Sequence, residues 1–326
     1  MAQIYDMIII GSGPAGLSAA IYAARAKLDA IVIEQNYVSG GQVINTYEVD
    51  NYPGLPGMNG FDMGNTFREH AGKMGAVFSQ EKVESIQIES DQVKQTEDAQ
   101  LQAAESRQSG SLKKVVTDKN EYETKTIVIA TGARHSKLGI PGEEKLSGMG
   151  VSYCATCDGA FFKDKTVAVV GGGDVAVEDA IFLSRLCKKV YVIHRRDELR
   201  AAKALQEKLF AQENVEMVWD SIATEIHGET QVTAITVENV KDKSQKELVV
   251  DGVFIAVGII PNSELFKGLV DTDERGYLTA GEDCRTNVEG VFATGDVRTK
   301  QLRQIVTAVS DGANSITTAQ EYLLHL

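Results

Sequence analysis

The hydrophobic pattern of the chain alternates between short apolar runs and longer stretches with helical periodicity. Each apolar run predicts a buried strand, and these runs occupy residues 4–10, 30–33, 166–170, 190–193 and 252–257. The helical stretches cover residues 17–26, 60–78, 174–187, 201–212 and 303–324, and residues 77–88 read as strand. Strands that alternate with helices favour parallel sheets covered by helices, so the predicted fold class is α/β.

One internal segment, residues 89–111, interrupts this pattern. It is rich in Gln, Glu and Ser and contains few large apolar residues. Such a composition predicts an exposed hairpin tip or a partly disordered loop. A solvated connection without a function of its own is the favoured interpretation.

Composition and charge exclude several classes of protein. The chain of 326 residues is 43% hydrophobic, which is enough for two globular domains. Its net charge of -13 argues against a general nucleic-acid surface. Apolar runs stay below the roughly 20 residues that a membrane span needs, and the first residues show no secretory signal. We therefore expect a cytoplasmic protein that binds neither membrane nor nucleic acid.

A glycine-rich turn at residues 11–16 separates the first predicted strand from the first predicted helix. In such a turn Gly11 permits the bend, Gly13 lets the backbone approach a pyrophosphate, and Gly16 lets the helix pack on the strand. The next strand ends in Glu34, 18 residues after Gly16, where a carboxylate can bind a ribose hydroxyl. The predicted contacts with the nucleotide are Gly11, Gly13, Pro14, Ala15, Gly16, Glu34 and Gln35.

A second turn of the same kind lies at residues 171–176 and again connects a strand to a helix. Here the strand that follows runs into His194, 18 residues after Ala176, and then into two arginines. Arginine accommodates a ribose 2′-phosphate, whereas the acid at the first turn favours a free 2′-hydroxyl. The first site is therefore predicted to bind FAD and the second NADPH. The predicted NADPH contacts are Gly171, Gly173, Asp174, Ala176, His194, Arg195, Arg196 and Arg200.

Between the two turns lies the pair Cys154 and Cys157, which Asp158 follows directly. Two cysteines separated by two residues close a small disulfide that is readily reduced and reoxidised. The adjacent carboxylic acid is suited to protonate a departing thiolate. Zinc binding is the weaker alternative, because the other two cysteines and the five scattered histidines supply no further ligands at short spacing. No metal site is therefore predicted.

Together these motifs resemble the low-molecular-weight thioredoxin reductases over nearly the whole chain. The matching motifs are GSGPAG at 11–16, GGQ at 40–42, NYPG at 51–54, ATG at 130–132, CATCDG at 154–159, GGGDVA at 171–176, HRRDELR at 194–200, ATGDV at 293–297 and RQ at 303–304. The most specific is CATCDG inside the second nucleotide domain, because glutathione-reductase-type relatives carry their cysteine pair in the FAD domain. Ser310 departs from the glycine that is common at this place.

The resemblance implies two Rossmann-like domains of the three-layer ββα type, with the NADPH domain inserted into the FAD domain. The FAD domain would comprise residues 1–136 and 264–326, and the NADPH domain residues 137–263. A homodimer is also implied. Further FAD contacts would be Gly41, Gln42, Asn51, Thr131, Gly132, Gly295, Asp296, Arg303, Gln304 and Ile305.

The implied activity is NADPH-dependent reduction of the thioredoxin disulfide. Cys154 resembles the cysteine that attacks thioredoxin, Cys157 the one that faces the flavin, and Asp158 the acid. The inserted domain would rotate about crossings near residues 132–133 and 258–261. Reduction by ferredoxin, reduction of another small dithiol protein and a flavin-bound redox sensor without turnover are the alternatives. The intact second turn and its arginines argue against ferredoxin.

Overall fold

A computed structural model describes residues 3–46, 49, 51–88 and 112–326, so the excursion expected at 89–111 lies outside the described residues. The chain divides into two compact units. The first unit comprises residues 1–45, 58–134 and 260–326, and the second comprises residues 46–57 and 135–259. The sequence did not predict that residues 46–57 would group with the second unit. The predicted boundaries near 136 and 264, and the cofactor assigned to each domain, stay predictions.

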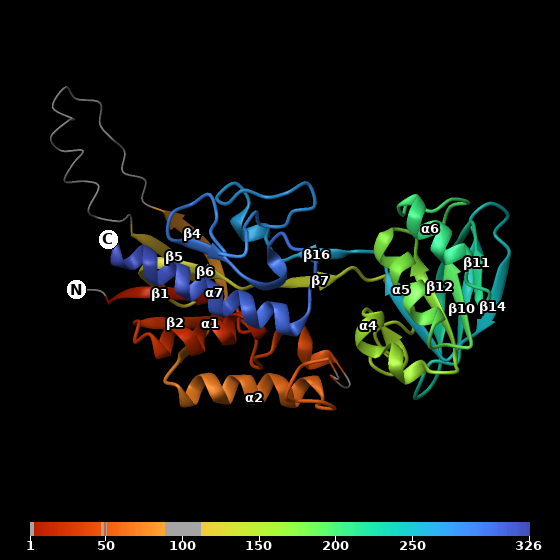
Figure 1. Ribbon diagram of the computed structural model, residues 1–326, viewed down its shortest axis with the longest axis horizontal. Helices are drawn as coiled ribbons and strands as arrows, with labels where there is room; N and C mark the ends of the chain where they lie inside the picture. Colours follow the sequence, from red (N-terminus) through yellow and green to blue (C-terminus); the bar gives the residue numbers. More distant parts are fainter. Residues whose placement is uncertain (1–2, 47–48, 50, 89–111) are drawn as a thin grey trace, which may run out of the picture. The chain divides into compact units, whose positions relative to one another are not determined.

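The first unit is built on a seven-stranded sheet in the order β3-β2-β1-β6-β5-β4, with β17 paired to β6. Figure 1 labels β1, β2, β4, β5 and β6 of this sheet. Its strands are β1 (Ile4–Ile10), β2 (Ala30–Glu34), β3 (Val77–Gln80), β4 (Val83–Ile88), β5 (Lys113–Thr117), β6 (Glu121–Ile129) and β17 (Val291–Ala293). Strands β1, β2, β3, β6 and β17 pair in parallel, while β4 and β5 are antiparallel. This is the α/β class that the alternation of strands and helices predicts.

In the described part of this unit, the α-helices are α1 (Pro14–Arg25), α2 (Gly60–Lys73) and α7 (Ile305–Leu324). Helix α7 packs closely on α1: a Cβ atom added to Gly312 would lie 2.2 Å from the carbonyl oxygen of Ala15. At the same contact the Ser18 hydroxyl donates a hydrogen bond of 2.7 Å to the carbonyl oxygen of Val309. This contact brings the C-terminal helix beside the first glycine turn.

The second unit contains a five-stranded parallel sheet in the order β11-β10-β9-β15-β8. The strands are β8 (Val151–Ser152), β9 (Thr166–Gly171), β10 (Lys189–Ile193), β11 (Val215–Val218) and β15 (Gly252–Ala256). An antiparallel sheet of β12 (Ser221–His227), β13 (Ala234–Asn239) and β14 (Gln245–Val249) adds a further layer. The helices are α4 (Ala155–Asp158), α5 (Asp174–Ser184) and α6 (Lys203–Phe210).

Two of the connections between the units pair with each other as short strands. These strands are β7 (Ala133–His135) and β16 (Ile259–Pro261), which form a two-stranded sheet. They coincide with the crossings that the sequence analysis names near residues 132–133 and 258–261.

One helix boundary was predicted wrongly. The stretch at 60–78 was expected to be helical throughout, but α2 ends at Lys73 and β3 begins at Val77. Gly75 adopts a positive φ of 96° between them, which is the left-handed conformation that glycine supplies after a helix. Apolar periodicity alone does not show where such a turn interrupts a helix.

Glu81, which lies between β3 and β4, is a buried carboxylate with both oxygens engaged. Its Oε1 accepts hydrogen bonds from Ser79 at 2.5 Å, Asn120 at 2.9 Å and Tyr122 at 2.6 Å, and its Oε2 accepts from Thr117. Burial alone would raise the pKa of this carboxyl, but the four hydrogen bonds to its charged form outweigh burial and lower the pKa to about 2. The charged form of Glu81 therefore stabilises this end of the sheet.

We expect Glu81→Gln to destabilise the protein at pH 7 by about 3 kcal/mol, because the folded pKa of about 2 lies well below the ordinary glutamate pKa of 4.5. A lowered pKa gives stability that is present above about pH 4.5 and is lost as the pH falls toward 2. The difference from the wild type should therefore shrink below pH 4. Urea unfolding at pH 7 and pH 3.5 measures it. The exposed neighbour Glu84→Gln is the control, and an equal loss in both variants would contradict the interpretation.

Candidate active site

The first glycine turn brings backbone atoms closer together than a side chain would allow. A Cβ atom added to Gly16 would lie 1.9 Å from the Gly11 carbonyl oxygen, and one added to Gly11 would lie 2.5 Å from the carbonyl oxygen of Ala130. Gly11 also has a positive φ of 103°. Helix α1 starts at Pro14 after Gly13, which gives no side-chain cap, so the N-terminal amides can receive an anion. These features fit a bound pyrophosphate.

Glu34 lies beside this turn, as its spacing predicts. Its Oε2 accepts hydrogen bonds of 2.8 Å from both the backbone nitrogen and the hydroxyl of Ser12. The Oε1 atom accepts from Asn36, whereas Gln35 is exposed. These four hydrogen bonds occupy the roughly four acceptor positions of the carboxylate, so a ribose hydroxyl at Glu34 would replace one of them.

Other predicted FAD contacts come from the loop after β2. Gly41 approaches the first turn, since its added Cβ would lie 3.2 Å from the Cα atom of Gly13. Gly41 and Gln42 are exposed, and they begin a short 3₁₀ helix at Gly41–Asn45. Asn51 is exposed and belongs to the second unit. The structure therefore brings Gly41 to the turn by backbone contact.

The loop between β17 and α7 carries the most informative of these residues, Asp296. Its Oδ1 atom is buried and has no hydrogen-bond partner within the described part of the chain. Burial raises the pKa of this carboxyl, against the opposing effect of Lys300 and Arg303. A buried polar atom without a partner is rare in a folded protein, and a ligand hydroxyl would satisfy it. Asp296 therefore fits a contact with FAD.

A buried ion cluster holds this loop in place. Asp311 of α7 receives the Arg298 guanidinium at 2.8 Å and 2.7 Å, the Lys300 ammonium at 2.8 Å and the backbone nitrogen of Gly295 at 3.0 Å. The pKa of Asp311 is lowered by these cations, although burial opposes them. This cluster was not predicted from the sequence. Its one sequence signal is two basic residues directly after the Gly-Asp turn, close to the start of an amphipathic helix.

The remaining predicted residues of the first unit have structural partners. Arg303 stacks on the ring of Tyr277 at 3.9 Å and donates to the Asp296 carbonyl oxygen at 3.4 Å. Gln304 caps helix α7, whose first residue is Ile305. The hydroxyl of Thr131, which precedes Gly132, donates to the backbone carbonyl of Asn262 at 2.7 Å, and the Asn262 amide donates back to the Thr131 carbonyl at 2.8 Å. Asn262 was not predicted, because it lies 131 residues away in the chain.

The second glycine turn repeats this geometry in the second unit. A Cβ atom on Gly171 would lie 2.5 Å from the Ala256 carbonyl oxygen, and one on Gly172 would lie 2.2 Å from Nδ1 of His194. His194 is buried, and its Nε2 has no hydrogen-bond partner among the residues that the structure describes. Burial lowers the pKa of His194, and the positive charges of nearby arginines add to the effect. Gly173 precedes α5 without a side-chain cap, so the amides of this helix are also open to phosphate.

Three arginines surround this turn, as the sequence predicts. Arg195, Arg196 and Arg200 are exposed, and in the described ranges none of them forms an ion pair. The backbone nitrogen of Arg200 donates to the Gly172 carbonyl oxygen at 2.8 Å, which ties the arginine segment to the turn. Asp174 instead binds the backbone nitrogen of Ala202 at 2.8 Å. Arginine side chains beside an open helix N-terminus fit a 2′-phosphate and a pyrophosphate.

The cysteine pair lies between β8 and α5 and forms a disulfide with a Cα–Cα distance of 5.3 Å. Cys154 is the residue before helix α4, and Cys157 lies within it. Asp158 ends this helix; its Oδ2 accepts from the Ser152 hydroxyl at 2.6 Å, while its Oδ1 is buried without a partner in the described chain. Burial raises the pKa of Asp158, so the acid holds its proton more readily than an exposed aspartate.

The other two cysteines are separate from this chemistry. Cys187 and Cys284 are buried free thiols, and burial raises their pKa to about 11 and about 12. A thiol of such high pKa carries almost no nucleophilic thiolate at neutral pH.

Within the described residues no group of three or more His, Cys, Asp or Glu side chains is arranged to hold a metal ion, and no helix has the length and apolarity of a membrane span.

Comparison with known proteins identifies the family. The model of the pyridine nucleotide-disulphide oxidoreductase family matches residues 5–312. The chain belongs to this family. Membership confirms the predicted cofactors, FAD and NADPH, and the predicted α/β fold class with two Rossmann-like domains.

Similar proteins in this family carry a more specific name. A thioredoxin reductase of Listeria innocua is 45% identical over 325 residues, which cover 99% of this chain and 95% of the relative. A thioredoxin reductase of Bacillus subtilis is 42% identical, with 99% and 96% covered. The crystal structure of thioredoxin reductase from Streptococcus pyogenes is 43% identical, with a TM-score of 0.89 and complete coverage of both chains.

We expect Arg195→Ala combined with Arg196→Ala to raise the KM for NADPH roughly 100-fold, because two charge-assisted hydrogen bonds to the 2′-phosphate are lost. The KM for NADH should stay within about twofold, since NADH has no 2′-phosphate. Steady-state kinetics with both nucleotides measure the difference. Exposed Arg185→Ala at the end of α5 is the control. Equal changes for the two nucleotides would exclude a phosphate clamp.

Proposed function

We propose that this oxidoreductase is an NADPH-dependent thioredoxin-disulfide reductase. The observation that carries the proposal is the Cys154–Cys157 disulfide, which is followed by a half-buried acid and lies in the same unit as the arginine-flanked turn. Full-length relatives at 42–45% identity are named thioredoxin reductases. The substrate is accordingly the disulfide of a thioredoxin, and the chain acts as a homodimer in the cytoplasm.

FAD would be held in the first unit and NADPH in the second. The Gly11–Gly16 turn would bind the FAD pyrophosphate, Glu34 a ribose hydroxyl and Asp296 a further hydroxyl. The turn at 171–176, with Arg195, Arg196 and Arg200, would bind NADPH. FAD supplies the two-electron redox chemistry that connects NADPH to the disulfide.

The chain's own residues then carry out thiol–disulfide exchange. The Cys154 thiolate attacks one sulfur of the thioredoxin disulfide, and the other sulfur leaves with the electron pair and takes a proton from Asp158. Cys157 next gives its proton to Asp158 and attacks the Cys154 sulfur, which releases the second thioredoxin sulfur. That thiolate takes a proton from solvent. The enzyme disulfide re-forms, and Asp158 regains its starting state.

Domain rotation is part of this proposal. The disulfide and the NADPH residues belong to one unit, so both need access in turn to the flavin of the other unit. The disulfide must also reach a protein substrate. The paired strands β7 and β16 are the candidate hinge, because they contain the connections that enter and leave residues 135–259.

An anaerobic titration tests the proposed electron path. NADPH should bleach the flavin absorbance of the purified holoenzyme, and oxidised thioredoxin should restore it. With NADPH and oxidised thioredoxin both in excess, the enzyme should then turn over repeatedly. Bleaching by reduced ferredoxin but not by NADPH would replace the proposal with the ferredoxin-dependent alternative, against which the intact second turn argues.

We expect Cys154→Ser to abolish thioredoxin reduction, with a loss of more than about 1,000-fold, because the attacking thiolate is gone. Reduction of the flavin by NADPH should still occur, since it precedes the cysteine chemistry. Stopped-flow absorbance follows the flavin, and a coupled thiol assay follows thioredoxin. Cys187→Ser, at a buried free thiol, is the matched control. Continued turnover of thioredoxin by Cys154→Ser would show that another sulfur attacks.

A further inference from the structure

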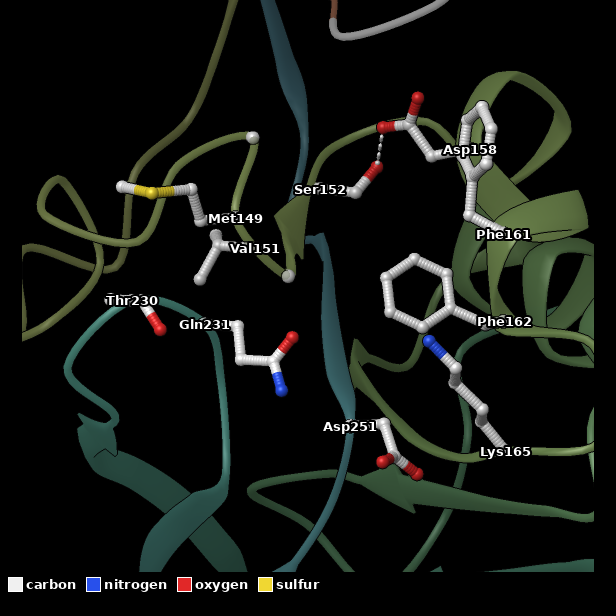
Figure 2. Close-up of a pocket in the computed structure, with 12 residues that line it drawn as sticks. Met149, Val151, Ser152, Asp158, Phe161, Phe162, Lys165, Thr230, Gln231 and Asp251 are labelled. Carbon is white, nitrogen blue, oxygen red and sulfur yellow. Dashed lines mark hydrogen bonds between the residues drawn. The ribbon is translucent and has the colours of Figure 1, made fainter.

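Ser152 connects two parts of the redox site. It is the last residue of β8, only 5% exposed, and precedes Cys154 by two positions. Its hydroxyl oxygen lies 2.6 Å from Oδ2 of Asp158 and 3.1 Å from the backbone nitrogen of Cys154 (Figure 2 draws the contact with Asp158). The exchange steps described above do not use this side chain.

The two short contacts of Ser152 fix the direction of its hydrogen bonds. The backbone N–H of Cys154 can only donate, so the serine oxygen accepts this bond. The serine hydrogen is then free for Asp158, whose Oδ2 is closer, at 2.6 Å, than the Cys154 carbonyl oxygen, at 3.3 Å. A chain of two hydrogen bonds therefore runs from the backbone of Cys154 through Ser152 to Asp158.

This chain determines which oxygen of Asp158 carries the proton. The carbonyl oxygen of a protonated carboxyl accepts a hydrogen bond better than its hydroxyl oxygen, and a proton donated from Oδ2 to the serine oxygen would turn the serine hydrogen to the more distant Cys154 carbonyl oxygen, at 3.3 Å. Protonated Asp158 therefore holds its proton on Oδ1, which is buried and has no partner in the described chain. The proton thus stays on the oxygen that no protein donor occupies, where it can be transferred.

We propose that Ser152 is a positioning residue: it holds Oδ2 of Asp158 so that the transferable proton resides on Oδ1. The proposal rests on the proposed role of Asp158 in thioredoxin reduction. In that reaction the Oδ1 proton passes to the leaving thioredoxin sulfur, and the Cys157 thiol returns a proton to Oδ1. Ser152 gains and loses no proton. Its hydrogen bond to the Cys154 backbone fixes the position of Asp158 relative to the cysteine pair.

The surroundings of Asp158 contain few competing charges. Ser152 and Asp158 line a cavity of about 370 Å³, in which Lys165 and Asp251 supply the other charged side chains (Figure 2). Helix α5, which packs on α4, carries the half-buried carboxyl Asp179, and burial raises its pKa to about 7. Asp179 can therefore titrate near neutral pH, and a variant at this residue is needed as a control.

Removal of the serine hydroxyl should have a specific signature. The hydrogen bond from Ser152 lowers the pKa of Asp158 against the larger effect of burial, so Ser152→Ala should raise that pKa further. We expect kcat for thioredoxin to fall roughly 10- to 100-fold, which is part of the usual contribution of a general acid, while KM stays within about twofold. The alkaline limb of the kcat–pH profile, where Asp158 loses its proton, should move to higher pH. Ser152→Thr keeps the hydroxyl and should restore both values.

A double-mutant cycle on the holoenzyme separates positioning from structural support. If Ser152 acts through Asp158, adding Ser152→Ala to Asp158→Asn should cause no further loss of kcat. An equal loss in the wild-type and Asp158→Asn backgrounds would overturn the proposal, because Ser152 would then support the cysteine loop independently. Failure of Ser152→Thr to restore kcat would also overturn it.

A spectroscopic readout tests the same point without turnover. The infrared carboxyl band that disappears in Asp158→Asn reports the protonation of Asp158. The midpoint pH at which this band titrates should rise in Ser152→Ala. An unchanged midpoint would contradict the proposal. The controls are Asp179→Asn and Ser221→Ala. Ser221 is also 5% exposed, and its hydroxyl donates to a backbone carbonyl. Both variants should keep the wild-type midpoint.

Two further outcomes separate this proposal from the proposed function. If the wild type reduced no thioredoxin, the proposed function would fail. If the wild type were active and Ser152→Ala were unaffected, only the role of Ser152 would be removed.

Discussion

Close approach of backbone to backbone at two glycine turns is the constraint on which both nucleotide sites depend. Any side chain on Gly16 or Gly171 would overlap a carbonyl oxygen, at 1.9 Å and 2.5 Å respectively. The absence of that side chain lets a helix start directly at the end of a parallel strand. The free backbone amides at the start of that helix can then bind an anion without a dedicated charged residue. In the proposed function, the acid after one turn and the arginines after the other select which nucleotide is held.

The sequence predicted the features that short-range geometry determines. Turn spacing, the cysteine pair and the charge that follows each turn depend on residues within about 20 positions, so the pattern contains them. Asn262 was not predicted because its partner lies 131 residues away and meets it only after the sheet has formed. Asp311 lies only 11 to 16 residues from its partners, but the sequence pattern does not show that the loop folds back onto the helix. Ser152 was missed for another reason. A serine before a cysteine motif has no periodic signal, and its role appears only when the direction of its hydrogen bonds is known.

Reactivity in the chain is confined by burial. All four cysteines are available to oxidation in principle, yet Cys187 and Cys284 are held as neutral thiols inside apolar clusters. The remaining pair is half-buried and forms the disulfide. A reductase that passes electrons through sulfur needs this separation, because any further reactive thiol would compete for the same disulfide exchange.

The buried carboxyls divide in the same way, and the division distinguishes stabilising acids from reactive ones. Glu81 and Asp311 have both oxygens bound by donors, and their pKa values are lowered, so they remain charged and hold loops in place. Asp158 and Asp296 each retain one buried oxygen without a partner in the described residues, and burial raises their pKa values. Leaving such an oxygen unpaired costs stability, of the order of 1–3 kcal/mol. The fold tolerates this cost at the two positions where a substrate sulfur and a cofactor hydroxyl are proposed to bind, which is where a free acceptor or a transferable proton is useful.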